Sequence, residues 1–113
     1  MAEYVQAQRA RNVLKRQYAE ALSRVDVIAS PTFAVVAPRH DDGPGTAVTS
    51  MPSYTGPYNL TGLPAISVPC GFTGAGLPSG LQLAGRPFEE ATILRAAHTY
   101  EQAAGHHLRR PPI

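Results

Sequence analysis

Proline and glycine are concentrated in the middle of this sequence. Residues 1–30 and 88–104 contain neither, whereas residues 31–87 hold nine of each. Because proline breaks helices and glycine weakens them, the two ends are predicted to be helical and the middle to consist of strands and loops. The expected order of elements is helix, strand, long loop, strand, strand, helix.

The two predicted helices carry different signals. The first is expected at about residues 2–24, because apolar side chains recur there every three or four residues. They are Tyr4, Ala7, Leu14, Tyr18, Ala21 and Val25. The opposite face is basic and is interpreted as a solvated surface, since no aromatic platform for nucleic acid accompanies it. The last helix is expected to begin near Pro87 and to end at Gly105, where glycine suits the left-handed closing residue.

Three short strands are predicted between the helices. The β-branched run in residues 25–30 stops at Pro31, and the apolar segments 65–69 and 80–84 are bounded by glycine and proline. The turn residues between the last two strands indicate a hairpin. Residues 39–57 are polar and rich in helix breakers, which predicts a long loop.

Composition excludes several classes of protein. The 113 residues suffice for one domain, and 43% hydrophobic against 16% charged residues excludes a disordered chain. A single cysteine excludes a disulfide framework and favours a reducing compartment, so a cytoplasmic location is expected. The net charge of +2 predicts no nucleic-acid partner, and the lack of an apolar run of about 18 residues predicts no membrane span.

The sequence contains no complete catalytic constellation. Cys70 follows a proline at a strand end, but no base or positive charge is predicted beside it, which favours a structural thiol over a nucleophile. No nucleophile elbow of the Gly-x-Ser-x-Gly type surrounds any of the six serines. They are Ser23, Ser30, Ser50, Ser53, Ser67 and Ser79.

Metal binding is not predicted either. The histidines lack the spacing of zinc ligands, so neither a metal nor any other cofactor is expected. They are His40, His98, His106 and His107. Asp41 and Asp42 flank a Gly- and Pro-containing stretch and are interpreted as residues of a solvated turn.

Three stretches of the sequence resemble a known family. "NLTGLPAISVPCGF" (residues 59–72) and "GLPSGLQLAGRPFEEATILRAAHTYEQ" (residues 76–102) resemble the carboxy-terminal segment of the amidase signature family of serine hydrolases. "VDVIASPTFAVVAP" (residues 25–38) is similar to the family's strand ending in a Ser/Thr-Pro-Thr sequence. The family includes general amidases and the A subunit of glutamyl/aspartyl-tRNA amidotransferase. The resemblance implies an α/β fragment of the amidase signature fold, a mixed β-sheet flanked by helices.

The resemblance also implies a mechanism whose residues are absent from this sequence. Family members hydrolyse carbon–nitrogen bonds with a serine in a Gly- and Ser-rich segment, a bridging serine on a cis peptide, and a lysine base. No such segment occurs here, and the only lysine, Lys15, lies in the first predicted helix. No catalytic residue is therefore carried over. Residues 1–113 are expected to be the C-terminal portion of one amidase domain, without its N-terminal catalytic half, because Met1 stands inside a predicted helix with no capping signal before it.

A part in the substrate pocket is implied as well. In the family, the segment before the Asn-Leu-x-Gly-x-Pro element lines the acyl side of the pocket, which makes Tyr54, Tyr58 and Asn59 the candidate pocket residues. The glutamine-using branch is expected to place an acid in this segment, and residues 49–58 contain none. This departure favours a general amidase acting on a small-molecule amide.

Three functions remain open at the level of sequence. The chain either completes the sheet and pocket of an amidase and is inactive alone, or is a stand-alone binding or regulatory module derived from that fold, or is a hydrolase based on Cys70. Since its strands resemble parts of a larger sheet, the isolated chain would expose strand edges and apolar surface. It is therefore expected to be weakly stable, or to associate with itself or with the missing half.

Overall fold

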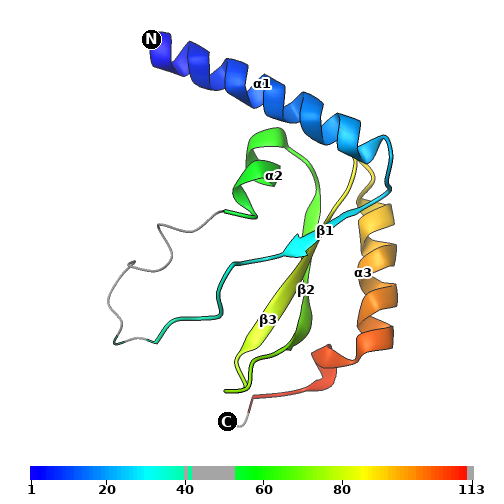
Figure 1. Ribbon diagram of the computed structural model, residues 1–113. Helices are drawn as coiled ribbons and strands as arrows, with labels where there is room; N and C mark the ends of the chain where they lie inside the picture. Colours follow the sequence, from blue (N-terminus) through cyan, green and yellow to red (C-terminus); the bar gives the residue numbers. More distant parts are fainter. Residues whose placement is uncertain (40, 42–52, 112–113) are drawn as a thin grey trace.

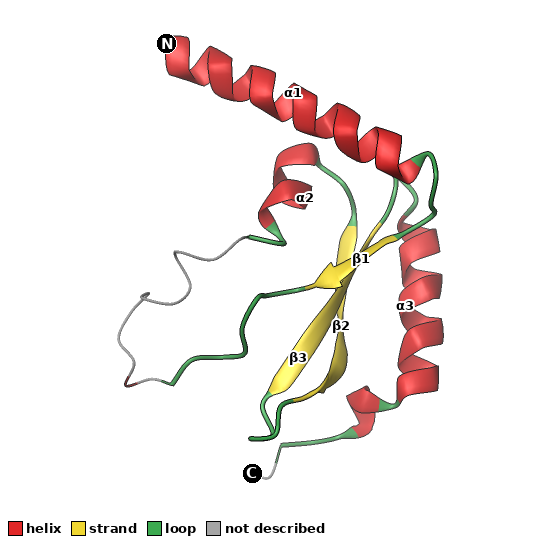
Figure 2. Ribbon diagram, viewed as in Figure 1, coloured by secondary structure: helices red, strands yellow, loops and turns green. Residues whose placement is uncertain are grey.

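The computed structural model describes residues 1–39, 41 and 53–111. In chain order its elements are α1 (Ala2–Leu22), β1 (Ile28–Pro31), α2 (Gly56–Thr61), β2 (Ala65–Phe72), β3 (Pro78–Ala84), α3 (Glu90–Ala104) and the short 3₁₀ helix η2 (His106–Leu108). Figure 1 shows α3 running alongside the strands, with α1 crossing one end of the sheet and extending past it. The predicted α/β class is confirmed, with helices flanking a single described sheet (Figure 2).

The sheet has the strand order β1-β3-β2, and both pairs are antiparallel. The predicted hairpin is confirmed, because β2 and β3 are consecutive in the chain and adjacent in the sheet. The first strand begins at Ile28 and not at Val25, which is 46% exposed. It also includes Pro31, a residue that lacks an N–H donor and that an edge strand such as β1 tolerates.

The core lies between the sheet and α3. Alternation along the strands places Leu81 and Leu83 of β3 and Val68 of β2 on the same face. Val68, Leu83 and Ala97 of α3 form the buried centre of this core. The partly buried side chains packed around it are Val27, Ile66, Leu81, Ala96 and Tyr100.

The predicted end of the last helix is confirmed, since Gly105 has the left-handed φ of 68°.

The apolar stripe predicted for α1 is largely uncovered. Tyr4 is 68% exposed, and the one buried side chain of this helix is Leu22, which does not belong to the stripe. The helix is held where Arg11 donates a hydrogen bond to the carbonyl of Leu60 and where its last turn meets the turn after β3. Because its first turns extend past the sheet, burial follows those contacts and not the periodicity of the helix.

Residues 56–61 form a helix, α2. The sequence predicts a loop at the first two of these residues and no element at the other four. Six residues are too few to show helical periodicity, so the pattern did not reveal it. The signals that mark it are Pro57 in the first turn and Gly62, which closes the helix at φ 75°. The rest of the predicted loop, apart from residues 39, 41 and 53–55, lies outside the described residues.

Arg86 joins the end of α1 to the turn that leads into α3. Its guanidinium donates to the carbonyl oxygens of Leu22 at 2.9 Å and Val25 at 3.0 Å, and it pairs with Asp26 at 3.2 Å and Glu89 at 3.1 Å. The hydrogen bond to Glu89, and to a smaller extent the one to Asp26, raise the pKa of Arg86 above its ordinary value. These contacts fix the end of α1 and the connection to β1 against the turn that leads into α3.

Candidate functional site

Three polar side chains form a row across the sheet face that α3 leaves uncovered. Ser30 of β1 and Ser67 of β2 are the register partners of Gln82 in the central strand. Gln82 is 4% exposed, and its amide nitrogen donates to the hydroxyl of Ser30 at 3.3 Å and to the carbonyl of Tyr54 at 3.0 Å. Because a buried amide without partners costs free energy, these bonds hold residue 54 against the sheet.

A glycine in the central strand allows two hydroxyl groups to meet. Thr32 Oγ1 and Ser67 Oγ are 2.5 Å apart, although Thr32 follows β1 and Ser67 lies in β2, and these two strands flank β3 on opposite sides. A Cβ atom on Gly80 would lie 2.7 Å from the Thr32 hydroxyl oxygen and 2.8 Å from that of Ser67. Gly80 is not among the residues with a left-handed backbone. Glycine is therefore required at this position by space and not by conformation.

This hydroxyl pair lines a groove of about 430 Å³. Phe33 to Val36, which follow β1, form one wall, and Pro69 and Pro78 belong to the other strands. Apolar walls with a few hydrogen-bonding groups are typical of sites for small ligands. Among the described residues no acid, base or lysine lines the groove, so these side chains can orient a carbonyl or an amide but supply no group to attack it.

The three predicted pocket residues occupy different environments. Tyr54 is partly exposed, and its backbone carbonyl accepts the bond from Gln82. Asn59 is exposed on α2. Tyr58 is buried, with its ring 5.5 Å from that of Tyr18 in an edge-to-face arrangement. The structure therefore brings Tyr54 and Tyr58 to the polar row, whereas Asn59 faces away from the interior of the described chain.

The hydroxyl of Tyr58 has a perturbed acidity. Burial raises the pKa of Tyr58 above its ordinary value of 10.0, the neighbouring Tyr18 raises it further, and a hydrogen bond with Ser30 partly opposes the rise. The folded state thus favours the neutral phenol. The stability that follows from this preference is fully present below the unfolded pKa of about 10 and is lost as the pH rises through the higher folded value.

Replacing Tyr58 with phenylalanine is expected to reduce the alkaline loss of stability. Urea unfolding measured at steps between about pH 8 and pH 11 should give a free energy of unfolding that falls at the alkaline end, and falls less steeply in Tyr58→Phe. Tyr4→Phe is the matched control, because Tyr4 is 68% exposed and should leave the slope unchanged. Identical slopes for the native chain and Tyr58→Phe would contradict the assignment.

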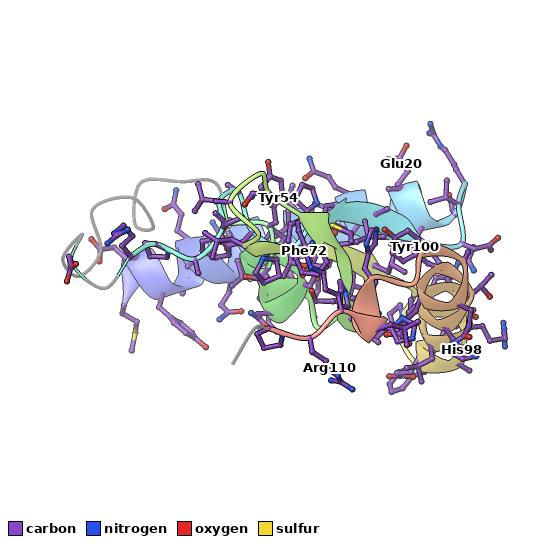
Figure 3. All side chains as sticks on the ribbon, turned by 90° about the horizontal axis from the view of Figure 1, so that it is seen from below. Glu20, Tyr54, Phe72, His98, Tyr100 and Arg110 are labelled. Atoms are coloured by element: carbon purple, nitrogen blue, oxygen red, sulfur yellow. The ribbon has the colours of Figure 1, made fainter. Side chains whose placement is uncertain are left out.

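The other sequence candidates do not form a site with this row. Cys70 is half-buried, and its sulfur lies 3.6 Å from the Ser79 hydroxyl, which is not a base. Among residues 1–39, 41 and 53–111, no three His, Cys, Asp or Glu side chains are grouped as metal ligands would be. His98 is exposed on α3 (Figure 3), while His40 and Asp42 lie outside the described residues. In the described part of the chain, no helix is long and apolar enough to cross a membrane.

Sequence reasoning missed the residues that organise this face. The motif search takes Ser30 and Ser67 only as possible nucleophiles and gives Gln82 no role. A usable signal was present, because Ser67 stands between Ile66 and Val68, just as Gln82 stands between two leucines. A polar residue flanked by apolar residues in a strand faces away from the core. The pairing of these positions across three strands was not visible from that pattern.

Comparison with known proteins places the chain beside amide-processing enzymes. A family profile described as Amidase matches residues 1–94. The A subunit of the glutamyl-tRNA(Gln) amidotransferase of Moorella thermoacetica is 44% identical over 114 residues, covering 99% of this chain and 23% of that protein. The protein of the same name from Methanosarcina barkeri is 45% identical over 111 residues, covering 96% of this chain and again 23% of that protein. The chain thus spans less than a quarter of these curated relatives.

Solved structures share the fold. The A subunit of the glutamyl-tRNA(Gln) amidotransferase from Thermotoga maritima matches with a TM-score of 0.84 and 36% identity, covering 91% of this chain and 23% of that chain. The peptide amidase from Stenotrophomonas maltophilia matches with a TM-score of 0.66 and 30% identity, covering 93% of this chain and 21% of that chain. The described elements therefore correspond to one segment of larger enzymes.

Proposed function

The chain belongs to the amidase family, and on that basis we propose that it completes the sheet and the substrate pocket of an amidase that hydrolyses carbon–nitrogen bonds, without being active alone. The observation that carries this proposal is the length of the match. Nearly all of the chain aligns with a relative of which it covers only 23%. We propose that residues 1–113 are the C-terminal portion of one amidase domain. We also propose a cytoplasmic location, because a chain with a single cysteine suits a reducing compartment.

The proposal assigns the chemistry to the other part of the domain. The family's nucleophilic serine, bridging serine and lysine base would come from that part, since this sequence has no Gly- and Ser-rich segment. The described residues would contribute a face that positions a small amide. The Gln82 bond holds the backbone at Tyr54 in place, and we propose Tyr54, Tyr58 and Asn59 as residues of the pocket wall.

Two observations favour different classes of substrate. Residues 49–58 contain no acid to hold a substrate's α-amino group, which favours a simple amide without that group. The curated relatives cited above are named as amidotransferase subunits, which favours glutamine as the second candidate. We propose the simple amide first, because the missing acid is a property of this chain itself.

A chimera tests the proposed function. Residues 1–113 would replace the matching segment of the Stenotrophomonas maltophilia peptide amidase, and ammonia release from a peptide amide, a simple amide and glutamine would be measured. We expect hydrolysis by the chimera and none by the isolated chain or by the amidase lacking the segment. Hydrolysis by the isolated chain that disappears in Cys70→Ala would overturn the proposal in favour of the thiol.

The chimera must also be shown to fold. Far-UV circular dichroism and a cooperative melt would establish this, and the separately produced chain would be tested for binding to the truncated amidase. A chimera that folds like the parent enzyme but hydrolyses none of the three substrates contradicts a role in completing the pocket. Stable binding without activity would instead support a non-catalytic binding module.

A further inference from the structure

A second hollow lies at the opposite end of the sheet from α1. It is bordered by the turn between β2 and β3 and by the segment that follows α3, and it has a volume of about 620 Å³. It shares Pro69 and Pro78 with the groove described above, and its other lining residues are different. Its charged and ring-bearing lining residues are Phe72, His106, His107, Arg109 and Arg110. In Figure 3, Arg110 and Tyr54 lie on opposite sides of Phe72. We call this feature the C-terminal hollow.

Arg109 is held over an aromatic ring in this hollow. Its guanidinium carbon is 4.2 Å from the centroid of the Phe72 ring, and the His106 ring meets the same ring at 6.2 Å in an edge-to-face arrangement. A guanidinium held over a ring in this way can still donate through its N–H groups. Those donors match the two oxygens of a carboxylate in a planar, bidentate geometry.

The surroundings leave that positive charge without an acid. Among the described residues, no Asp or Glu side chain lines the hollow, and Arg109 and Arg110 form no ion pair with a described acid. The Nδ1 atom of His107 is buried and has no hydrogen-bond partner in the described part of the chain. Buried polar atoms are normally satisfied, so a water, a ligand or another part of the chain is expected to reach this one.

The remaining lining of the hollow is apolar. Leu77, Pro69 and Pro78 stand beside Phe72, so the cationic groups are backed by hydrocarbon surface. The volume falls within the usual range for small-molecule sites, about 300–1,000 Å³. An anion that is hydrated on all sides would leave this apolar surface unused. A carboxylate attached to an apolar body would satisfy both parts of the lining.

From this geometry we propose that the C-terminal hollow binds a small organic carboxylate with an apolar body, through the edge of the Arg109 guanidinium. The carboxylate takes the N–H donors of Arg109, and the apolar body lies against Phe72 and Leu77. His107 supplies a further polar contact at the inner side. The proposal concerns a site outside the groove near Gly80 and does not depend on amide hydrolysis.

Binding of benzoate to the chain tests the proposal. Titration followed by NMR should give saturable shifts at residues of the hollow, and the neutral isostere benzamide should bind at least about tenfold more weakly, because it lacks the charge. Arg109→Gln should weaken benzoate binding about tenfold. Arg95→Gln is the matched control, since it removes the same charge from the exposed surface of α3 and should leave the affinity unchanged.

Several results would overturn the proposal. They are the absence of saturable shifts in a folded chain, equal binding of benzoate and benzamide, or an unchanged dissociation constant in Arg109→Gln. Binding of inorganic phosphate as tight as that of benzoate would contradict the apolar part of the site. If Arg109→Gln fails to fold, Arg109→Lys keeps the charge without the planar fork and is expected to weaken benzoate binding by a smaller but measurable factor.

Discussion

Replacing Gly80 with alanine is expected to destabilise the chain by about 1–3 kcal/mol, the usual cost of inserting a methyl group into an occupied space. The new Cβ atom would lie 2.7 Å and 2.8 Å from the hydroxyl oxygens of Thr32 and Ser67, and 3.2 Å from the Cβ atom of Thr32. The two hydroxyls would have to separate and lose their mutual hydrogen bond. Strand propensity by itself favours alanine over glycine. A loss of stability in Gly80→Ala would therefore show that the lack of space around residue 80 outweighs strand propensity. Urea unfolding measures the change.

Two further variants make the Gly80 result specific. Gly74→Ala is the matched control, because no atom lies within 4 Å of its added Cβ and its backbone is not left-handed, so stability should stay within about 0.5 kcal/mol. In a chain that already carries Thr32→Ala and Ser67→Ala, Gly80→Ala should cost less, since the nearest atoms are gone. An equal cost in both backgrounds would rule out the hydroxyl pair as the cause.

The second large effect is expected for Leu83→Ala. Leu83 is 6% exposed and belongs to the buried centre between β3 and α3 together with Val68 and Ala97. Truncating a buried leucine usually costs about 2–5 kcal/mol, because apolar contacts are lost and a cavity remains. A domain of this kind has a total stability of only about 5–15 kcal/mol. We therefore expect a markedly lower urea midpoint, or a chain that no longer folds cooperatively.

An exposed leucine of α3 provides the control for that experiment. Leu94 is 54% exposed, so Leu94→Ala should change the free energy of unfolding by about 0.5 kcal/mol or less. If Leu83→Ala and Leu94→Ala lowered stability equally, the core would not be centred on Leu83. If the proposed function holds, the chimera carrying Leu83→Ala should also lose amide hydrolysis, because the displaced strand carries Gln82 of the polar row.

The order of elements could be predicted because its signals are local. Proline lacks a backbone N–H, and glycine reaches left-handed conformations, so each marks a boundary within a few residues. The hairpin between β2 and β3 and the end of α3 at Gly105 were predicted in this way and are confirmed. The exposure of the apolar stripe of α1 was not predictable, because periodicity indicates which face of a helix is apolar but not how much of the helix another element covers.

The candidate site was predicted less well, because its contacts join distant parts of the sequence. Ser30 and Gln82 are 52 positions apart, and Thr32 and Ser67 are 35 positions apart. Their contacts exist because β3 inserts between β1 and β2 in one particular register, and a shift by one residue would turn these side chains to the other face. The sequence selected Tyr54 and Tyr58 through a family resemblance and gave no account of what holds them.

The amino-acid sequence by itself determined the order of the main helices and strands, and which family the chain belongs to, because both depend on residues read in order along the chain. Only the tertiary structure decided that Gly80 leaves room for two hydroxyls and that Arg109 lies over Phe72. The physical reason is that such contacts depend on strand order, register and the path of the chain after α3. Those features are fixed by packing across the whole fold and not by any one segment.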